Sequence, residues 1–255
     1  MKKALLIVSV AVFGLSFGCG GGKSAINNIE MVFVEGGTYV SGHSNRDTFT
    51  VKAFCLAKYE TTQGLWKAVM GSNPSHFKGD DLLPVENVSW HNAQKFIKKL
   101  NAKTGKKYRL PDIREWEYAM RGGNKSNGYG YPGSNNIDDV AWFGGRHDNS
   151  GMNIYNYDYR KLIVYYGNSG DKTHPVGTKL ANELGLHDMS GNVYEWMNNI
   201  SIRPGKFGGT DRTGYLGGGS YNDWADACSI SRYTIHSTPP FIKCPSWGFR
   251  LAHDP

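Results

Sequence analysis

The most informative stretch of this 255-residue sequence is GLHDMSGNVYEW, residues 185–196. It places two acidic side chains and two glycines among large apolar residues and ends in a tryptophan. Short segments of similar character lie on both sides of it. In chain order they are MVFVEGG (31–37), KYETTQ (58–63), PVENVSW (84–90), YRLP (108–111), EWEYA (115–119), GGSY (218–221) and GFRL (248–251). No linker or fixed repeat separates them, so they indicate one domain covering residues 29–255.

Local signals predict three helices and a few strands in the first half of this domain. The helices begin at Thr61 or Thr62, at Ser89 and at Asp112, and the first two end near Met70 and Gly105. Strands are expected over residues 31–40, interrupted at Gly36-Gly37, and over residues 49–56. Periodicity fades from Gly122 to about Gly170. We therefore expect little regular structure and a core rich in aromatic side chains, including Trp66, Trp90, Trp116 and Trp196.

The N-terminus has the features of an export signal. Lysines and an apolar run fill residues 1–17, and Gly18 precedes Cys19 in an arrangement that resembles a bacterial lipobox. Residues 1–18 are then a lipoprotein signal peptide, and residues 19–28 are a lipidated Cys19 with a tether. An ordinary secretory signal with a chance cysteine is the alternative. The lipobox predicts an outer membrane lipoprotein of the bacterial cell envelope, exposed at the cell surface.

The charge of the chain bears on its partners, and its cysteines bear on its disulfides. The formal net charge of +7 falls to +5 when the two lysines of the signal are removed, and the basic residues are spread among acidic ones. No dense basic run is present, so we expect no nucleic-acid partner. Cys55, Cys228 and Cys244 remain after lipidation. Three cysteines allow one disulfide with a spare thiol, or three free thiols.

In this order, the quoted segments resemble the sulfatase-modifying-factor family, whose founding members are the formylglycine-generating enzymes. The resemblance spans nearly all of the mature chain. It implies an α+β domain with the C-type lectin-like fold of the formylglycine-generating enzyme subclass. Such a domain has low regular secondary structure and a ligand face near its C-terminus.

The same resemblance argues against catalysis. Family oxidases bind copper through two cysteines spaced five apart after the GGS motif, and these positions fall on Asp223 and Cys228. A carboxylate is a hard ligand and cannot replace a thiolate for Cu(I). Cys244 lies too far along the chain to inherit the role. We therefore expect no copper and no enzymatic activity, with Cys228 acting as a small buried apolar side chain.

A calcium site of the family matches Asp188, Gly191, Val193 and Glu195. The resemblance implies a structural ion held by the two carboxylates and by the backbone carbonyls of Gly191 and Val193, which are hard oxygen donors. In the alternative interpretation, Asp188 caps a turn and Glu195 pairs with a nearby arginine or lysine. The family's other calcium site is not recognisable over residues 140–156.

Residues 222–247 are framed by family motifs but are irregular inside. They resemble the variable region of proteins diversified by retroelements, among them variable lipoproteins of Treponema. Glu, Gln and Met are absent here, as diversified codons require, whereas Lys243, Trp224 and Trp247 would be fixed. The candidate ligand-binding residues are Asp223, Trp224, Asp226, Ser229, Ser231, Tyr233, Ile235, His236, Ser237, Phe241, Ile242, Cys244, Ser246 and Trp247.

The sequence therefore predicts a non-catalytic, surface-displayed lipoprotein that binds a protein or another macromolecule through a diversified C-terminal site. Its lipid would attach it to the membrane, and calcium would be its one cofactor. Two alternatives stay open. One is a formylglycine-generating-type oxidase with altered metal ligation, acting on a cysteine of a sulfatase-like substrate. The other is a scaffold subunit of an envelope machine.

Overall fold

The computed structural model describes residues 25–41, 47–147, 164–204, 209–231 and 236–255. The strands are β1 Met31–Val34, β2 Gly37–Val40, β3 Thr48–Val51, β4 Phe54–Ala57, β5 Gly145–His147, β6 Val164–Tyr166, β7 Tyr194–Pro204, β8 Thr210–Gly217, β9 His236–Thr238, β10 Trp247–Gly248 and β11 Ala252–His253. The helices are α2 Gln63–Met70, α3 Trp90–Thr104, α4 Ile113–Met120 and α5 Ile137–Val140, with 3-10 turns η1 Gly123–Lys125 and η3 Ala225–Cys228. The predicted signal peptide and Cys19 lie outside these residues. Within the described ranges, no helix has the length and apolar character needed to span a bilayer.

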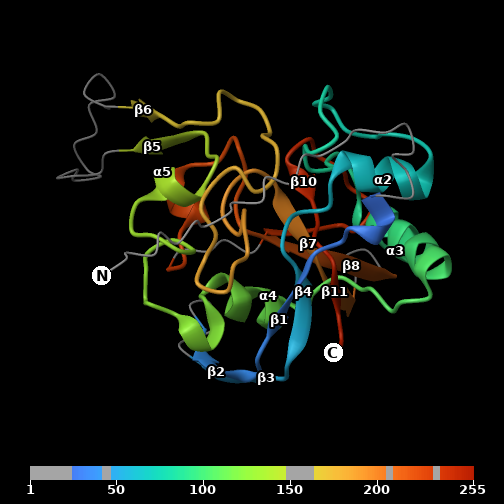
Figure 1. The fold of residues 1–255 in the computed structure, drawn as a ribbon, viewed down its shortest axis with the longest axis horizontal. Helices are drawn as coiled ribbons and strands as arrows, with labels where there is room; N and C mark the ends of the chain where they lie inside the picture. The colour runs from blue at the N-terminus through green and yellow to red at the C-terminus, as the bar shows by residue number, and fades with distance from the viewer. Residues whose placement is uncertain (1–24, 42–46, 148–163, 205–208, 232–235) are drawn as a thin grey trace, which may run out of the picture.

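The two ends of the domain are held together by one strand. β4 lies between β1 and β11 and is antiparallel to both (Figure 1). The backbone N–H of Ala57 donates to the carbonyl oxygen of Leu251 at 2.7 Å, and Arg109 and Ala252 exchange two hydrogen bonds of 2.8 Å. Because the first and last strands share β4, the chain closes on itself as one unit.

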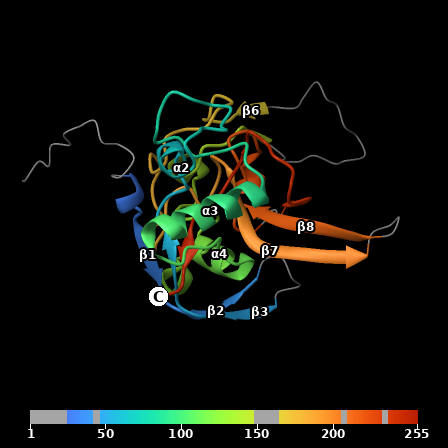
Figure 2. The ribbon, with the colours of Figure 1, turned by 90° about the vertical axis from the view of Figure 1, so that its right-hand side faces the viewer.

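The main sheet has the order β10-β7-β8-β9. Its centre is the antiparallel hairpin of β7 and β8, whose register is irregular between Trp196 and Ile200. Beyond this irregularity and past the end of β9, the pairs from Ser201 with Thr213 to Pro204 with Thr210 form a two-stranded ribbon that projects from the body (Figure 2). The inner half of the hairpin is therefore part of the core, and the outer half is exposed to solvent.

All three predicted helix starts are confirmed. The Thr62 side chain accepts a hydrogen bond from the backbone of Leu65, and Ser89 and Asp112 form complete capping boxes with Asn92 and Glu115. Each side chain satisfies an N–H group that the first helical turn leaves unpaired.

The predicted strand over residues 49–56 is divided by the structure into the end of β3 and the start of β4. The cause is a close backbone approach at Gly36. A Cβ atom there would lie 2.8 Å from the oxygen of Val51 and 2.9 Å from the nitrogen of Ala53. The chain turns around this glycine, which also separates β1 from β2 as predicted. The described part of residues 122–170 holds only short elements, as expected.

Aromatic side chains supply much of the core. Trp66 stacks on Phe96 with ring centroids 5.1 Å apart, and both rings contact Phe249 edge-on. Trp116 and Trp196 are fully buried. Trp90 is half-buried, and its indole N–H donates to the carbonyl oxygen of Met197 at 2.9 Å. These large rings replace the buried area that longer helices and strands would otherwise provide.

Candidate functional site

The predicted ligand-binding segment, residues 222–247, lies on both sides of the β7–β8 hairpin. β9 pairs with β8 at one edge, and β10 runs parallel to β7 at the other. Between them, the carbonyl oxygens of Cys244 and Pro240 accept hydrogen bonds from the backbone of Asn87 and His91 at 3.0 and 3.4 Å. The segment is thus attached to the sheet twice and to the start of α3, so its outward side chains stand on fixed backbone.

One group of the predicted ligand-binding side chains is exposed. It consists of Trp224, Asp226, Ser231, His236, Ser237, Phe241 and Ile242. Phe241 is 65% exposed and Trp224 is 42% exposed. Aromatic side chains beside polar ones are typical of contact surfaces. Tyr233 and Ile235 lie outside the described residues.

A second group of the predicted ligand-binding side chains is half-buried or buried. It consists of Asp223, Ser229, Cys244, Ser246 and Trp247. The Ser229 hydroxyl donates to the carbonyl oxygen of Asp226 at 2.9 Å, and the buried Ser246 hydroxyl lies 3.2 Å from the sulfur of Cys244. Trp247 packs edge-on against Trp196. Ser229 and Ser246 are buried and internally bonded, so they support the surface from below, and contact between this second group and a ligand stays a prediction.

Asp223 joins the exposed surface to the interior. Its carboxylate accepts hydrogen bonds from the hydroxyls of Ser220 and Tyr194, the latter at 3.2 Å. Tyr194 is buried, and burial together with the charge of Asp223 raises the pKa of its hydroxyl. The exposed His236 packs edge-on against the Tyr194 ring at 4.7 Å. The exposed His236 therefore packs directly on Tyr194, whose hydroxyl is hydrogen-bonded to Asp223.

Cys228, which the resemblance places at the second cysteine position of the family oxidases, lies in a closed, buried site. Cys228 is 1% exposed, and a Cβ atom at Gly219 would lie only 2.6 Å from its sulfur. Burial raises the pKa of this thiol, and the negative charge of Asp223 raises it further. Metal ligation requires the thiolate, so a thiol held protonated in an apolar site is a poor ligand. Cys55, Cys228 and Cys244 are all free in this structure, which corresponds to the second of the two predicted arrangements.

The motif of residues 185–196 surrounds a buried arginine. The guanidinium of Arg250 donates to both carboxylate oxygens of Glu195 at 2.6 and 2.7 Å, and the Trp116 indole adds a bond of 2.7 Å. Asp188 accepts from the backbone of Gly177 at 2.7 Å. Burial raises the pKa of Asp188 to about 6. A bidentate arginine pair of this kind is specific in geometry and stays in place only when all its members are present.

This arrangement bears on the expected calcium ion. The carboxylate of Glu195 is fully engaged by Arg250 and Trp116, and a guanidinium beside it would repel a cation. The described residues contain no cluster of three His, Cys, Asp or Glu side chains that could hold a metal. The geometry is that of the alternative interpretation, in which Asp188 accepts a turn N–H and Glu195 pairs with an arginine. As placed, these residues do not fit a calcium ion.

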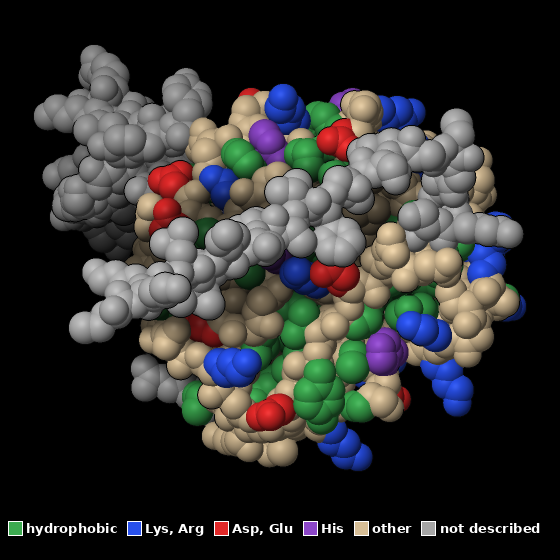
Figure 3. Space-filling model, viewed as in Figure 1, with side chains coloured by type: hydrophobic (Ala, Val, Ile, Leu, Met, Phe, Trp, Pro, Cys, Tyr) green, Lys and Arg blue, Asp and Glu red, His purple; other side chains and the backbone are tan. Residues whose placement is uncertain are grey.

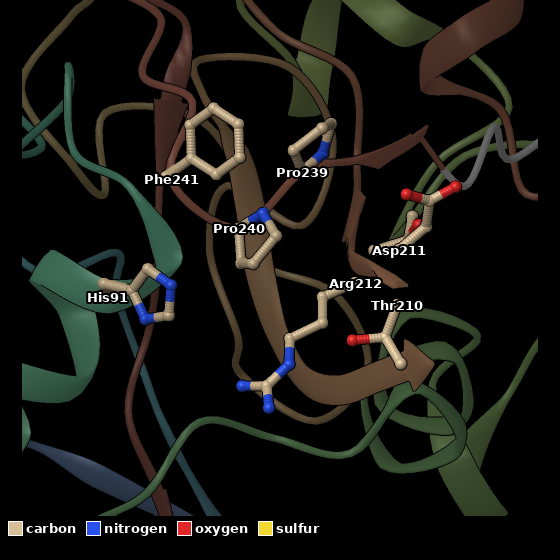
Figure 4. Close-up of a pocket in the computed structure, with 8 residues that line it drawn as sticks. His91, Thr210, Asp211, Arg212, Pro239, Pro240 and Phe241 are labelled. Atoms are coloured by element: carbon tan, nitrogen blue, oxygen red, sulfur yellow. The ribbon is translucent and has the colours of Figure 1, made fainter. Parts of the chain in front are cut away.

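Two features of the site were missed at the level of sequence. One is the projecting ribbon, although Ile200 and Ile202 alternate with polar residues in front of Pro204-Gly205. The other is a groove of about 580 Å³ between the ribbon, the start of α3 and residues 239–241 (Figure 4). Its walls come from segments far apart in the chain, so no local pattern could indicate it.

The fold and the motifs of residues 31–37, 185–196, 218–221 and 248–251 together define a formylglycine-generating enzyme-like domain. Residues 21–255 match the family described as sulfatase-modifying factor enzyme 1-like domain. The chain belongs to this family, which confirms the resemblance found in the sequence.

Three relatives show the range of this family. Chaperone protein LppX of Paenibacillus barcinonensis is 36% identical over 232 residues, covering 77% of this chain and 80% of LppX. The formylglycine-generating enzyme of Mus musculus is 29% identical over 211 residues, and the match covers 74% of this chain but 51% of the enzyme. The chain thus spans about half the length of that enzyme. The structure of Treponema denticola variable protein 1 superposes with a TM-score of 0.70 at 27% identity, covering 88% of this chain and 95% of that one.

Proposed function

We propose that this chain is a non-catalytic, lipid-anchored protein of the bacterial envelope that binds a polypeptide ligand at its C-terminal surface. The observation that supports the proposal most directly is that residues 222–247 combine exposed side chains with a fixed backbone. The exposed side chains are aromatic and polar, and the backbone is hydrogen-bonded to the sheet and to the start of α3. The names of two relatives, a chaperone and a variable protein, support binding rather than catalysis.

The oxidase alternative has less support. It requires a reactive thiolate, whereas Cys228 is buried beside Asp223 with a raised pKa. Copper-dependent conversion of a cysteine in a sulfatase-type peptide, lost in Cys228→Ser, would revive this alternative. The scaffold alternative predicts a stable co-purifying envelope complex rather than reversible binding.

Membrane attachment rests on Cys19. A lipid on this residue would hold the domain on the outer membrane, exposed at the surface, with residues 19–28 as a tether. Metabolic labelling with a fatty acid, followed by surface proteolysis of intact cells, tests both points. Cys19→Ser must abolish the label. On the face shown in Figure 3, basic side chains are scattered rather than gathered into a band, which supports a partner other than nucleic acid.

Diversification of residues 222–247 is a separate part of the proposal. An imperfect second copy of the DNA encoding this segment, beside a reverse transcriptase and differing mainly at adenines, would establish it. Without such a repeat, the surface has a single fixed specificity.

Binding can be tested with the intact mature protein and a chemically unfolded reporter protein. Light scattering measures whether the chain suppresses aggregation of the reporter on dilution. We expect Phe241→Ala combined with Trp224→Ala to lose this effect. The matched control is Phe33→Ala, because Phe33 is 56% exposed but lies in β1, away from the segment. Equal suppression by all the variants would refute the proposed surface.

A further inference from the structure

The outer half of β8 presents a strand edge that has no partner strand among the described residues. Residues 210–213 pair with β7 on one side, whereas β9 reaches only as far as the pair of Thr238 with Gly214. Pro239 and Pro240 follow directly, and proline has no N–H group with which to continue a ladder. No strand in the described ranges covers this edge. An exposed strand edge is a template for another strand.

The register shows which backbone groups point outward. Thr210 lies opposite Pro204, and a proline cannot form a hydrogen-bonded pair because it lacks a donor. Hydrogen-bonded and non-hydrogen-bonded pairs alternate in an antiparallel ladder. Arg203 and Asp211 therefore exchange hydrogen bonds, and Arg212 directs its N–H and C=O away from β7. Thr210 and Arg212 thus offer donors and acceptors at the two-residue spacing that an added strand uses.

The groove beside this edge has a mixed chemical character. Pro239, Pro240 and the largely exposed Phe241 give it an apolar side, and Arg212 and His91 reach it from β8 and α3 (Figure 4). Asp211 also lines the groove. Because neighbouring residues of a strand point to opposite faces, the side chains of Asp211 and Arg212 point in different directions. Arg212 forms no ion pair with any described residue. The groove therefore favours carboxylate and apolar groups in one ligand.

We propose that the open edge of β8 binds an extended acidic segment of a partner polypeptide by strand addition. One carboxylate of the segment lies opposite Arg212, and an apolar side chain packs on Phe241. The backbone ladder supplies affinity and the alternating side chains supply selectivity. This inference rests on the proposed function, since it specifies how the polypeptide ligand is held.

The opposite edge of the ribbon offers a comparison within the same molecule. Ile202 lies across from Arg212 in the ladder, so its N–H points outward from β7. That edge carries Pro204 at its end, a residue that protects edges against pairing. Substitutions at Arg212 and Ile202 therefore perturb equivalent positions on two edges, of which only the β8 edge adjoins the groove.

The test uses a synthetic peptide of about eight residues, a usual strand length, with alternating glutamate and valine and one phenylalanine. Its counterpart carries lysine in place of glutamate. Residue-resolved amide exchange is measured by NMR on the full mature chain with Cys19→Ser. We expect the glutamate peptide to slow exchange at Thr210 and Arg212 by at least about tenfold, with no change at Asp211, which is already bonded to β7. We expect no slowing with the lysine peptide. Binding of the glutamate peptide without protection of Thr210 and Arg212 would overturn strand addition, and equal protection by both peptides would overturn the preference for an acidic segment.

Matched variants separate the contribution of the backbone hydrogen bonds from that of the Arg212 charge. Arg212→Pro removes the outward N–H and should abolish protection at Thr210. Arg212→Ala keeps that N–H and should weaken the glutamate peptide by about tenfold, the loss of one charge pair. Ile202→Pro should bind like the parent chain, and its circular dichroism controls for folding of the ribbon. If Ile202→Pro and Arg212→Pro lose binding of the glutamate peptide to the same extent, the peptide does not bind specifically at the β8 edge.

The two proposals fail in different ways. If the unfolded reporter binds through Trp224 and Phe241 while Thr210 and Arg212 stay unprotected, strand addition is wrong and the proposed function stands. If neither the reporter nor the peptide binds, both are wrong.

Discussion

Arg250 and Phe241 lie close together in the sequence but in opposite environments. The guanidinium of Arg250 is fully buried and bonded to Glu195 and to backbone carbonyls of residues 57, 187 and 188. Phe241 is mostly exposed, at the rim of the groove. A position whose polar groups are all satisfied internally cannot change alone, because a substitution leaves its partners unpaired. A side chain that lies mostly in solvent is freer to change. The contrast explains how one short stretch can hold both a fixed fold determinant and an exposed surface whose side chains can vary.

The largest effect is expected on the buried side of this comparison. Arg250→Met leaves the carboxylates of Glu195, Glu60 and Asp188 without their shared cation, and should cost about 3–5 kcal/mol of unfolding free energy or prevent folding. Urea denaturation measures the change.

The control is Arg109→Met, which removes a partly exposed pair with Glu115 and should cost about 1 kcal/mol. Similar losses in the two variants would remove the distinction between the interior and the surface.

A second effect concerns pH. Burial raises the pKa of Glu86 to about 7, and one of its oxygens has no hydrogen-bond partner. A raised folded-state pKa contributes stability that is present below the unfolded value near 4.3 and is lost as the pH rises through about 7. Glu86→Gln cannot ionise, so it should be more stable than the parent at pH 8 by on the order of 2 kcal/mol, with little difference at pH 4.

The urea midpoint at the two pH values checks this. Glu30→Gln serves as the control, since it removes a carboxylate whose pair with Lys58 is exposed at the surface. The raised pKa of Glu86 would be contradicted if the unfolding free energy of the parent chain rises from pH 5 to pH 8 and that of Glu86→Gln rises equally.

Thiol reactivity is a smaller test of the same contrast. Cys228 is buried and its pKa is raised, whereas Cys244 is half-buried in the exposed segment. In native Cys19→Ser protein near neutral pH, Cys244→Ala should lower the number of thiols that react with a disulfide reagent, and Cys228→Ala should leave it unchanged. Rapid reaction at Cys228 would point back to a functional thiolate.

Calcium gives the smallest expected change. Because Arg250 engages the Glu195 carboxylate, calcium should not alter Tm beyond about 1 °C relative to EDTA. A rise of several degrees with calcium would mean that the ion displaces Arg250 and would establish the predicted site.

Most of the local structure could be predicted from the sequence. The starts of α2, α3 and α4 were predictable because a cap is a contact between near neighbours, as at Ser89 and Asn92. Family motifs then specified the fold as a whole. The strand over residues 49–56 was predicted as continuous because the break depends on Gly36, which approaches it from the turn between β1 and β2.

The site was predictable only in outline. The boundaries of residues 222–247 followed from the motifs on either side, but exposure within the segment does not follow from residue type. Ser231 is exposed while Ser229 and Ser246 are buried. The groove and the open edge of β8 depend on where β9 stops relative to the hairpin, and strand pairing between distant segments has no local signature.

The most direct measurement compares stability and binding in a single variant, Trp224→Ala with Phe241→Ala. Phe241 is 65% exposed and Trp224 is 42% exposed, so the double variant should lose no more than about 2 kcal/mol of unfolding free energy. Binding of the unfolded reporter, measured by light scattering on the same preparation, should be lost. Intact binding in the stable variant would contradict a C-terminal binding surface, and a loss of several kcal/mol would show that these residues belong to the core.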